Sequence, residues 1–217
     1  MKKVVCSVAL LMASAGAFAG DFYVGLHYGQ SANGDFCNEE FFGDAESCED
    51  KGDGNKLSLG FQFNNYIAVE VAHVNSGELT ASGGYNDSWM GDTYSSSYKD
   101  NAEVKGWNLA AMASLPMGDS VSLFAKVGMF SWESELSGSW SYAFNTQSSG
   151  LQQDSGTFSH DDDGQSSSYG LGMSIKPSDS ISLLLEWQTY ADIEISGGDD
   201  SLETDVEMTT LGLQFQF

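Results

Sequence analysis

Apolar residues occupy every second position in short segments along the whole chain, and this alternation predicts β-strands rather than helices. In one such segment Ile67 and Val69 alternate with Ala68 and Glu70. The segments with this pattern are 22–30, 56–64, 66–75, 104–115, 121–132, 169–176, 181–190 and 206–217. Each has close to the roughly 9–11 residues of a tilted transmembrane strand.

Short turns alternate with long polar connections between these segments. The turns lie at 64–65, 116–120 and 177–180, and the polar connections, predicted as loops, lie at 31–55, 76–103, 133–168 and 191–205. This order predicts an up-and-down meander with both chain ends on the side of the short turns. Outer-membrane barrels have short periplasmic turns and long extracellular loops. We therefore expect an all-β fold, an eight-stranded antiparallel up-and-down transmembrane β-barrel.

The N-terminal residues 1–19 have the pattern of a secretory signal peptide. Lys2 and Lys3 precede an apolar stretch at 4–13, and Ala17-Phe18-Ala19 forms a cleavage signal. The alternative, a membrane anchor, is disfavoured because the apolar stretch is too short to span a bilayer. The predicted barrel domain is 20–217. Beyond residue 19 no apolar run is long enough for a transmembrane helix.

Alternation alone does not say which face of the sheet is outside. A soluble eight-stranded barrel of the lipocalin type would hold its apolar face inside, around a small ligand. Mid-strand charge is here nearly confined to Glu70, Lys126 and Glu186, which all lie on the face of small and polar residues. A water-exposed face would carry more charge, whereas a narrow polar interior tolerates a few charges if they pair. We therefore predict a lipid-facing apolar exterior, with Lys126 between the two glutamates.

The charge balance is strongly acidic. The sequence has 8 basic and 31 acidic side chains, a net charge of −23, and no arginine. Removal of Lys2 and Lys3 with the signal peptide makes the balance two charges more negative. Such a surface repels nucleic acid and attracts cations. We therefore expect no nucleic-acid partner.

Two cysteines follow the signal peptide, Cys37 and Cys48. In a secreted chain a short loop between two cysteines favours a disulfide. Free thiols are the alternative.

The chain ends on an alternating strand, with Leu211, Leu213, Phe215 and the terminal Phe217 on one face. A buried terminus of this kind predicts that the last strand pairs with the first and closes the barrel, which removes both sheet edges. Aromatic residues at both ends of the strands are typical of interfacial girdles. They are Phe22, Phe63, Tyr66, Phe215 and Phe217 at the periplasmic end and Tyr28, Trp107 and Tyr169 near the outer rim.

The chain resembles the small outer-membrane barrels of the OmpA/OmpX type. The resemblance rests on FYVGLHYG, YIAVEVAHV, LAAMASLPMGDSVSLFAKVG, LLLEWQTY and the aromatic terminus. It implies an interior charge cluster at Glu70, Lys126 and Glu186, made net negative because Met112 stands where the family carries a lysine. It also implies that the terminal residues Leu211, Leu213, Phe215 and Phe217 are read by the barrel-assembly machinery. The resemblance covers the barrel and not the peptidoglycan-binding domain that follows it in OmpA, so it carries no expectation of tethering to the cell wall.

The polar connections offer few catalytic or metal-ligating motifs. Acidic stretches in 31–55 and 133–168 could ligate Ca²⁺, but neither has the spacing of a known calcium loop, and solvated acidic loops are the simpler interpretation. His27, His73 and His160 lack a recognisable catalytic partner in the sequence. We predict no catalytic residues, no metal and no cofactor.

Aromatic residues punctuate the long connections. They are Tyr85, Trp89, Tyr94 and Tyr98 in 76–103 and Trp140, Tyr142 and Phe144 in 133–168. Aromatic residues among Ser, Gly and Asn are typical of binding loops. The third loop could also extend its hairpin above the membrane and offer an edge for strand addition. The alternative is that the loop tips simply pack on one another.

The predicted function is structural and surface-interacting, through adhesion or surface protection. The expected partners are outer-membrane lipid, lipopolysaccharide, the barrel-assembly machinery and an extracellular ligand of the loops, and we expect a monomer. A small cation-preferring pore and a lipid-A-modifying enzyme are the alternatives.

Overall fold

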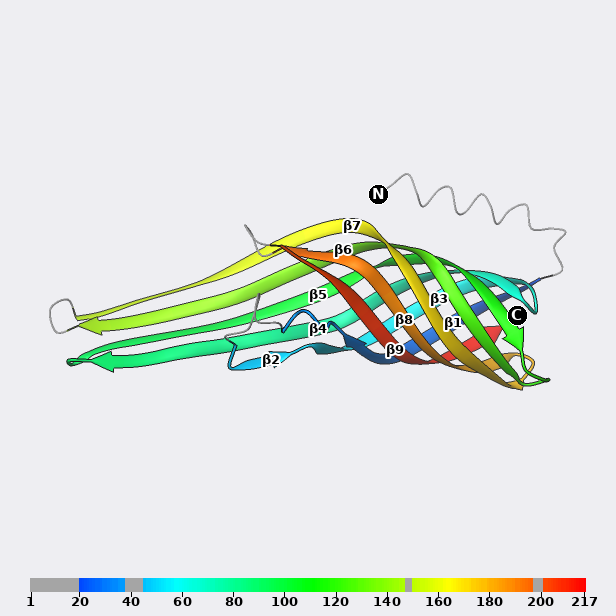
Figure 1. The fold of residues 1–217 in the computed structure, drawn as a ribbon, viewed down its shortest axis with the longest axis horizontal. Helices are drawn as coiled ribbons and strands as arrows, with labels where there is room; N and C mark the ends of the chain where they lie inside the picture. The colour runs from blue at the N-terminus through cyan, green and yellow to red at the C-terminus, as the bar shows by residue number, and fades with distance from the viewer. Residues whose placement is uncertain (1–19, 38–44, 147–149, 197–200) are drawn as a thin grey trace.

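The computed structural model describes residues 20–37, 45–146, 150–196 and 201–217, and it contains β-strands throughout (Figure 1). The predicted signal peptide lies outside the described residues. No helix in these ranges is long and apolar enough to cross a bilayer. The strands are β1 (Asp21–Ala32), β2 (Ser47–Glu49), β3 (Lys51–Asn64), β4 (Ile67–Trp89), β5 (Asp92–Pro116), β6 (Val121–Thr146), β7 (Gly150–Ser178), β8 (Ile181–Ser196) and β9 (Ser201–Gln216).

Eight of these strands form a closed antiparallel ring, which confirms the predicted fold class. Neighbours in sequence pair with one another, and β1 pairs with β9 to complete the ring. At the closure the backbone N–H of Phe217 donates to the carbonyl of Phe22 at 2.8 Å. The short β2 lies outside the ring and pairs with β4 at Thr80–Ser82. Strands of a closed ring have no edge, as a bilayer requires.

The apolar face of each strand points outward. Leu109 is 63% exposed and Val127 is 65% exposed, whereas their neighbours Ala110 and Lys126 are buried inside the ring. Exposed leucines, valines and aromatics continue this band around the other strands. A surface of this kind is stable in lipid and would aggregate in water. The orientation excludes a soluble barrel with an apolar interior.

The strands on one side of the ring are much longer than a bilayer requires. Strands β4 to β7 continue beyond the barrel as a four-stranded antiparallel sheet, which projects to one side in Figure 1. We call this part, residues 78–103, 133–146 and 150–165, the sheet extension. β6 has 26 residues, so about 15 lie beyond the roughly 9–11 that cross the membrane. At about 3.3 Å per residue these reach on the order of 50 Å.

The prediction of a loop at 76–103 was therefore wrong, because this segment is a β-hairpin with Asp92 opposite Trp89 at its tip. At 133–168 the structure has the extended hairpin that was one of the expectations, and β6 pairs with β7 as far as Thr146 and Gly150. Their alternation of aromatic and small polar residues is a strand pattern with low hydrophobicity, since neither face is fully buried. Residues 31–55 also contain strand structure at β2 and the start of β3.

Candidate functional site

The barrel interior contains an ion-pair cluster. Lys126 Nζ lies 2.7 Å from Glu70 Oε1 and 2.7 Å from Glu186 Oε2. The side chains of all three residues are at most 2% exposed. The three sequence-predicted residues come from β4, β6 and β8, and the ring brings them together on the barrel axis. Lysine between two carboxylates is the arrangement that makes burial of these charges tolerable.

Lys56 of β3 completes the cluster, and sequence reasoning missed it. Its Nζ donates to Glu186 and lies 4.0 Å from Glu70 Oε1. Two lysines thus face two glutamates, so the expectation of a net negative interior was wrong. The signal was available, since Lys56 shares the inward face of its strand with Ser58 and Gly60.

Two further polar side chains line the same interior. The Tyr23 hydroxyl donates to Glu70 Oε2 at 3.0 Å, and its ring lies against Gly60, where a Cβ would meet the ring at 2.0 Å. His27 Nε2 lies 3.4 Å from Ser58 Oγ. This serine partner was not recognised in the sequence. His27 and Ser58 are both buried inside the barrel, 4% and 1% exposed.

Apolar layers lie above the charges. The lower layer joins opposite walls of the barrel and consists of Ala72, Val74, Val104, Phe130, Trp132, Tyr190, Ile193, Val206 and Met208. The upper layer consists of Phe36, Leu79, Ala81, Ala102, Leu136 and Ile195. Phe130 and Tyr190 reach across the interior with ring centroids 4.4 Å apart. The lumen is therefore filled from the charge cluster to its outer mouth.

The predicted disulfide between Cys37 and Cys48 is present. Both cysteines pack against the upper apolar layer, beside Phe36, which is fully buried. Asn33 Oδ1 accepts a hydrogen bond of 2.7 Å from the Thr204 hydroxyl. The packing holds the described part of the first extracellular connection against the base of the sheet extension, and the hydrogen bond holds it against β9.

The sheet extension has two chemically different faces. The face that continues the barrel interior carries Tyr85, Trp89, Tyr94, Tyr98, Trp140, Tyr142 and Phe144, and we call it the aromatic face. The pairs Tyr98–Trp140 and Tyr94–Phe144 are directly opposite in the register, so they share a face. The opposite face continues the lipid-facing side of the barrel, and we call it the serine face. It carries Ser82, Ser95, Ser97, Ser139, Ser141, Ser155 and Thr157.

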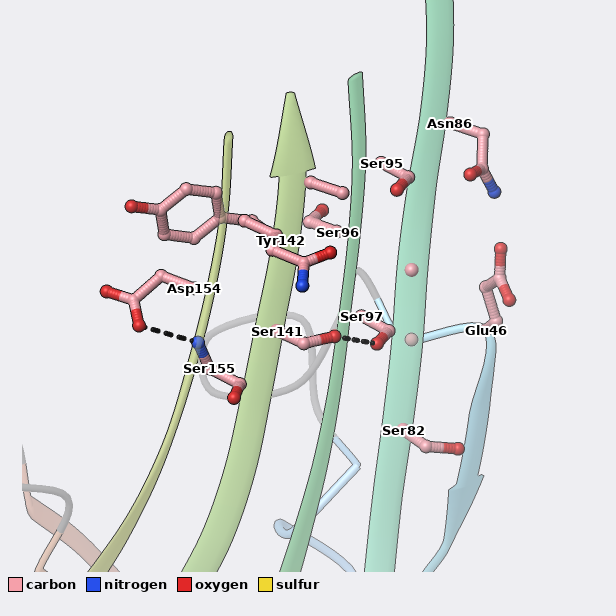
Figure 2. Close-up of a pocket in the computed structure, with 14 residues that line it drawn as sticks. Glu46, Ser82, Asn86, Ser95, Ser96, Ser97, Ser141, Tyr142, Asp154 and Ser155 are labelled. Atoms are coloured by element: carbon pink, nitrogen blue, oxygen red, sulfur yellow. Dashed lines mark hydrogen bonds between the residues drawn. The ribbon is translucent and has the colours of Figure 1, made fainter. Parts of the chain in front are cut away.

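Small side chains make the serine face hollow (Figure 2). A depression of about 760 Å³ lies over β4 to β7 and is bordered by Glu46. A second of about 550 Å³ shares Ser97, Ser141 and Ser155 with it. The hydroxyls of Ser97 and Ser141 are hydrogen-bonded at 2.9 Å (Figure 2). Tyr142 and Asp154 occupy the alternate positions of their strands and so belong to the aromatic face.

A row of carboxylates crosses the base of the serine face. Glu78 is opposite Glu103, Glu103 is opposite Glu135, and Glu135 is opposite Asp161. Directly opposed like charges destabilise a sheet. Lys105 offsets this in part, with Nζ 3.9 Å from Glu103 and 4.0 Å from Glu135. Within the described ranges, no group of three or more His, Cys, Asp or Glu residues is arranged to hold a metal ion.

The C-terminal residues lie as the barrel closure requires. Leu211, Leu213 and Phe215 point outward on β9, and the Phe217 side chain is 79% exposed. Phe217 contributes its backbone to the closure, while its ring remains exposed.

A closed ring of eight strands with an apolar exterior, a filled interior that contains a paired charge cluster, and short turns at one end defines an integral outer-membrane β-barrel of bacteria. The model of the OmpA-like transmembrane domain matches residues 17–217, and the chain belongs to that family. No curated protein matches the sequence.

Solved structures with this fold include several small outer-membrane proteins. Neisserial surface protein A has a TM-score of 0.50 and 11% identity, covering 90% of this chain and 97% of that chain. OprG from Pseudomonas aeruginosa has a TM-score of 0.45 and 12% identity, covering 93% and 98%. Ail of Yersinia pestis has a TM-score of 0.43 and 17% identity, covering 91% and 99%. At these identities the likeness concerns the fold alone.

Proposed function

We propose that this outer-membrane protein is a surface-interaction protein, in adhesion or surface protection, and that its sheet extension is the part that binds. The observation that carries this proposal is the exposure of large aromatic side chains far from the membrane. Trp89 is 75% exposed and Tyr85 is 55% exposed. Exposed aromatic patches on an otherwise polar surface mark interaction sites.

The construction of the sheet extension supports this proposal. A recognition surface needs a rigid support, because ordering a flexible loop on binding costs affinity. The extension is hydrogen-bonded along four strands, and its base is held by the upper apolar layer and the disulfide loop. β7 pairs with β8 only from Ser168 to Ser178. Residues 150–167 of β7 therefore pair with β6 alone and form one edge of the sheet.

The filled interior argues against the alternative of a pore. A conducting path would have to cross the cluster of Lys126 and Glu186 and then both apolar layers. An eight-stranded barrel is just wide enough for side chains to fill. Catalysis also has little support, since the His27–Ser58 pair is buried.

Truncation of the sheet extension tests the proposal. Ser82 is opposite Lys99 and Ser139 is opposite Thr157, so residues 83–98 and 140–156 can each be replaced by an Asn-Gly turn without changing the register. The test compares attachment of bacteria expressing each form to polystyrene, collagen and epithelial monolayers.

We expect the truncated form to reach the outer membrane in equal amount, to show heat-dependent electrophoretic mobility, and to lose attachment. Attachment equal to that of the intact protein on every surface would contradict the proposal. Planar-bilayer recordings complement the test, since stable channels in the intact protein would favour the pore.

A further inference from the structure

The aromatic face is an open platform of rings. Tyr94 and Phe144 are 39% exposed, and Trp140 is 40% exposed. The centroid of Tyr94 lies 6.1 Å from that of Tyr85 and 6.5 Å from that of Phe144. Trp140 and Tyr142 are parallel within 5°, with centroids 5.9 Å apart. The rings therefore form a continuous surface across β4, β5 and β6.

Glycines opposite two of the rings leave room for these rings to pack flat against the sheet. Gly156 is directly opposite Trp140, and a Cβ there would lie 2.8 Å from Cζ2 of the indole. Gly83 is directly opposite Tyr98, and a Cβ there would lie 2.7 Å from Cε1 of the phenol. A ring that leans over a glycine turns a π-face towards solvent.

The charged groups on the aromatic face are carboxylates. The described positions of this face carry Asp87, Asp92, Asp100, Asp154 and Asp162, and the one basic side chain among them is His160. Lys99 and Lys105 lie on the serine face instead. Asp87 and Asp154 are exposed among the rings, each accepting a hydrogen bond from the next backbone N–H. A carboxylate accepts about four hydrogen bonds, so both retain acceptor capacity.

We infer that the aromatic face binds an extended, cationic segment of a partner polypeptide, rich in arginine or lysine. This inference rests on the proposed function and names its partner class. Cations are attracted to the faces of Trp, Tyr and Phe, and guanidinium groups bind carboxylates in a bidentate manner. From Gly138 to Phe144 and across three strands the platform measures roughly 20 Å by 10 Å. An extended peptide of about six residues spans that length.

Other occupants fit this surface less well. Anionic glycans and nucleic acid would meet mainly carboxylates on this face, with His160 as the one basic side chain among its described residues. A second copy of the same chain carries the same negative charge and would be repelled. The face continues the interior side of the barrel, so the platform looks over the barrel mouth rather than sideways towards the lipid of its own membrane.

Calorimetric titration with capped hexa-arginine tests the inference, using the intact protein folded in phosphatidylcholine nanodiscs. Capped hexa-glutamate and the neutral sugar chitohexaose are the comparison probes. We expect hexa-arginine alone to bind, and Trp140→Ala to weaken binding about two- to five-fold. The double change Trp140→Ala with Tyr142→Ala is expected to weaken it further.

A matched pair of charge changes separates this site from general attraction to an acidic protein. Asp154→Asn on the aromatic face and Asp163→Asn on the serine face remove the same charge from the same strand, and both side chains are exposed. We expect Asp154→Asn to weaken binding about two- to five-fold and Asp163→Asn to leave it unchanged. Equal effects of the two changes, or wild-type affinity in Trp140→Ala, would overturn the inference. Preferred binding of chitohexaose would assign the face to a glycan and would equally overturn it.

The two proposals fail separately. If truncation abolishes attachment while hexa-arginine does not bind, the surface function stands and the cationic partner is wrong. If hexa-arginine binds as expected while truncation leaves attachment intact, the partner class stands and the surface function is wrong.

Discussion

Replacing Lys126 with methionine tests the energetic role of the interior cluster. Methionine is similar in length, so the change removes the charge and leaves little cavity. Lys126 Nζ is 2.7 Å from both Glu70 and Glu186, and its side chain is 1% exposed. Loss of one partner from a buried ion pair costs about 3–5 kcal/mol.

The structure indicates where that cost arises. After the change Glu186 keeps its close contact with Lys56, whereas Glu70 keeps the Tyr23 hydroxyl at 3.0 Å and Lys56 at 4.0 Å. Glu70 is therefore the carboxylate left without a close cation. We expect Lys126→Met to lower the free energy of unfolding by about 3–5 kcal/mol. Adding Glu70→Gln to Lys126→Met should restore at least half of that loss.

Urea titration in lipid vesicles, followed by tryptophan fluorescence, measures these differences. The matched control is Lys99→Met, since Lys99 is exposed on the sheet extension, and its expected effect is within about 0.5 kcal/mol. The reasoning is refuted if Lys126→Met costs less than about 1 kcal/mol, or if Glu70→Gln brings no recovery in the double variant.

Three further predictions concern parts outside the cluster. Replacing Cys37 and Cys48 with serine should speed proteolysis of the loop between them while the barrel stays folded, because a disulfide of this span contributes roughly 3 kcal/mol. Equal cleavage rates of the parent protein with and without reductant would contradict this prediction. Phe217→Ala should reduce the amount of barrel assembled in cells yet leave the urea midpoint of refolded protein unchanged, because the ring is 79% exposed; a lowered midpoint would make the ring structural. Burial raises the pKa of Asp100 above its ordinary 3.8, so the sheet extension should be most stable below that value and lose stability as pH rises through the raised pKa. Hydrogen exchange of the extension should show this dependence, and Asp100→Asn should remove it; an unaltered profile in that variant would assign the pH effect to other groups.

The barrel was predictable because the bilayer enforces a simple pattern. Alternation located all eight strands of the ring, and the placement of Glu70 and Lys126 gave the correct inside face. Lipid admits no charge on the outside and the narrow interior admits only paired charges, so these residues carry clear information. The disulfide was predictable from its loop length and compartment.

Loops were the main prediction for the sheet extension because its strands lack the apolar alternation of the membrane-spanning strands. In the segment around Trp140 and Tyr142 the neighbouring residues are mostly serine, glycine and asparagine, which are also the residues of loops. Strand structure there depends on cross-strand partners, such as Ser97 for Ser141 and Gly156 for Trp140, and these partners are distant in sequence. Lys56 was missed for a simpler reason. It is the first residue of its predicted strand, and the alternation was not used to assign its side chain to the inward face.

The central claim is that lipid surrounds the apolar outer face of the ring, while the charge cluster and the apolar layers above it fill the interior. A nitroxide scan along β5, one label at a time from Trp107 to Ala113, measures this directly through collisions with oxygen and with a water-soluble nickel complex. We expect labels at 107, 109, 111 and 113 to collide with oxygen and to be shielded from nickel, and labels at 108, 110 and 112 to be shielded from both. Uniform accessibility along the strand, or oxygen collisions at the even-numbered positions instead, would contradict the account.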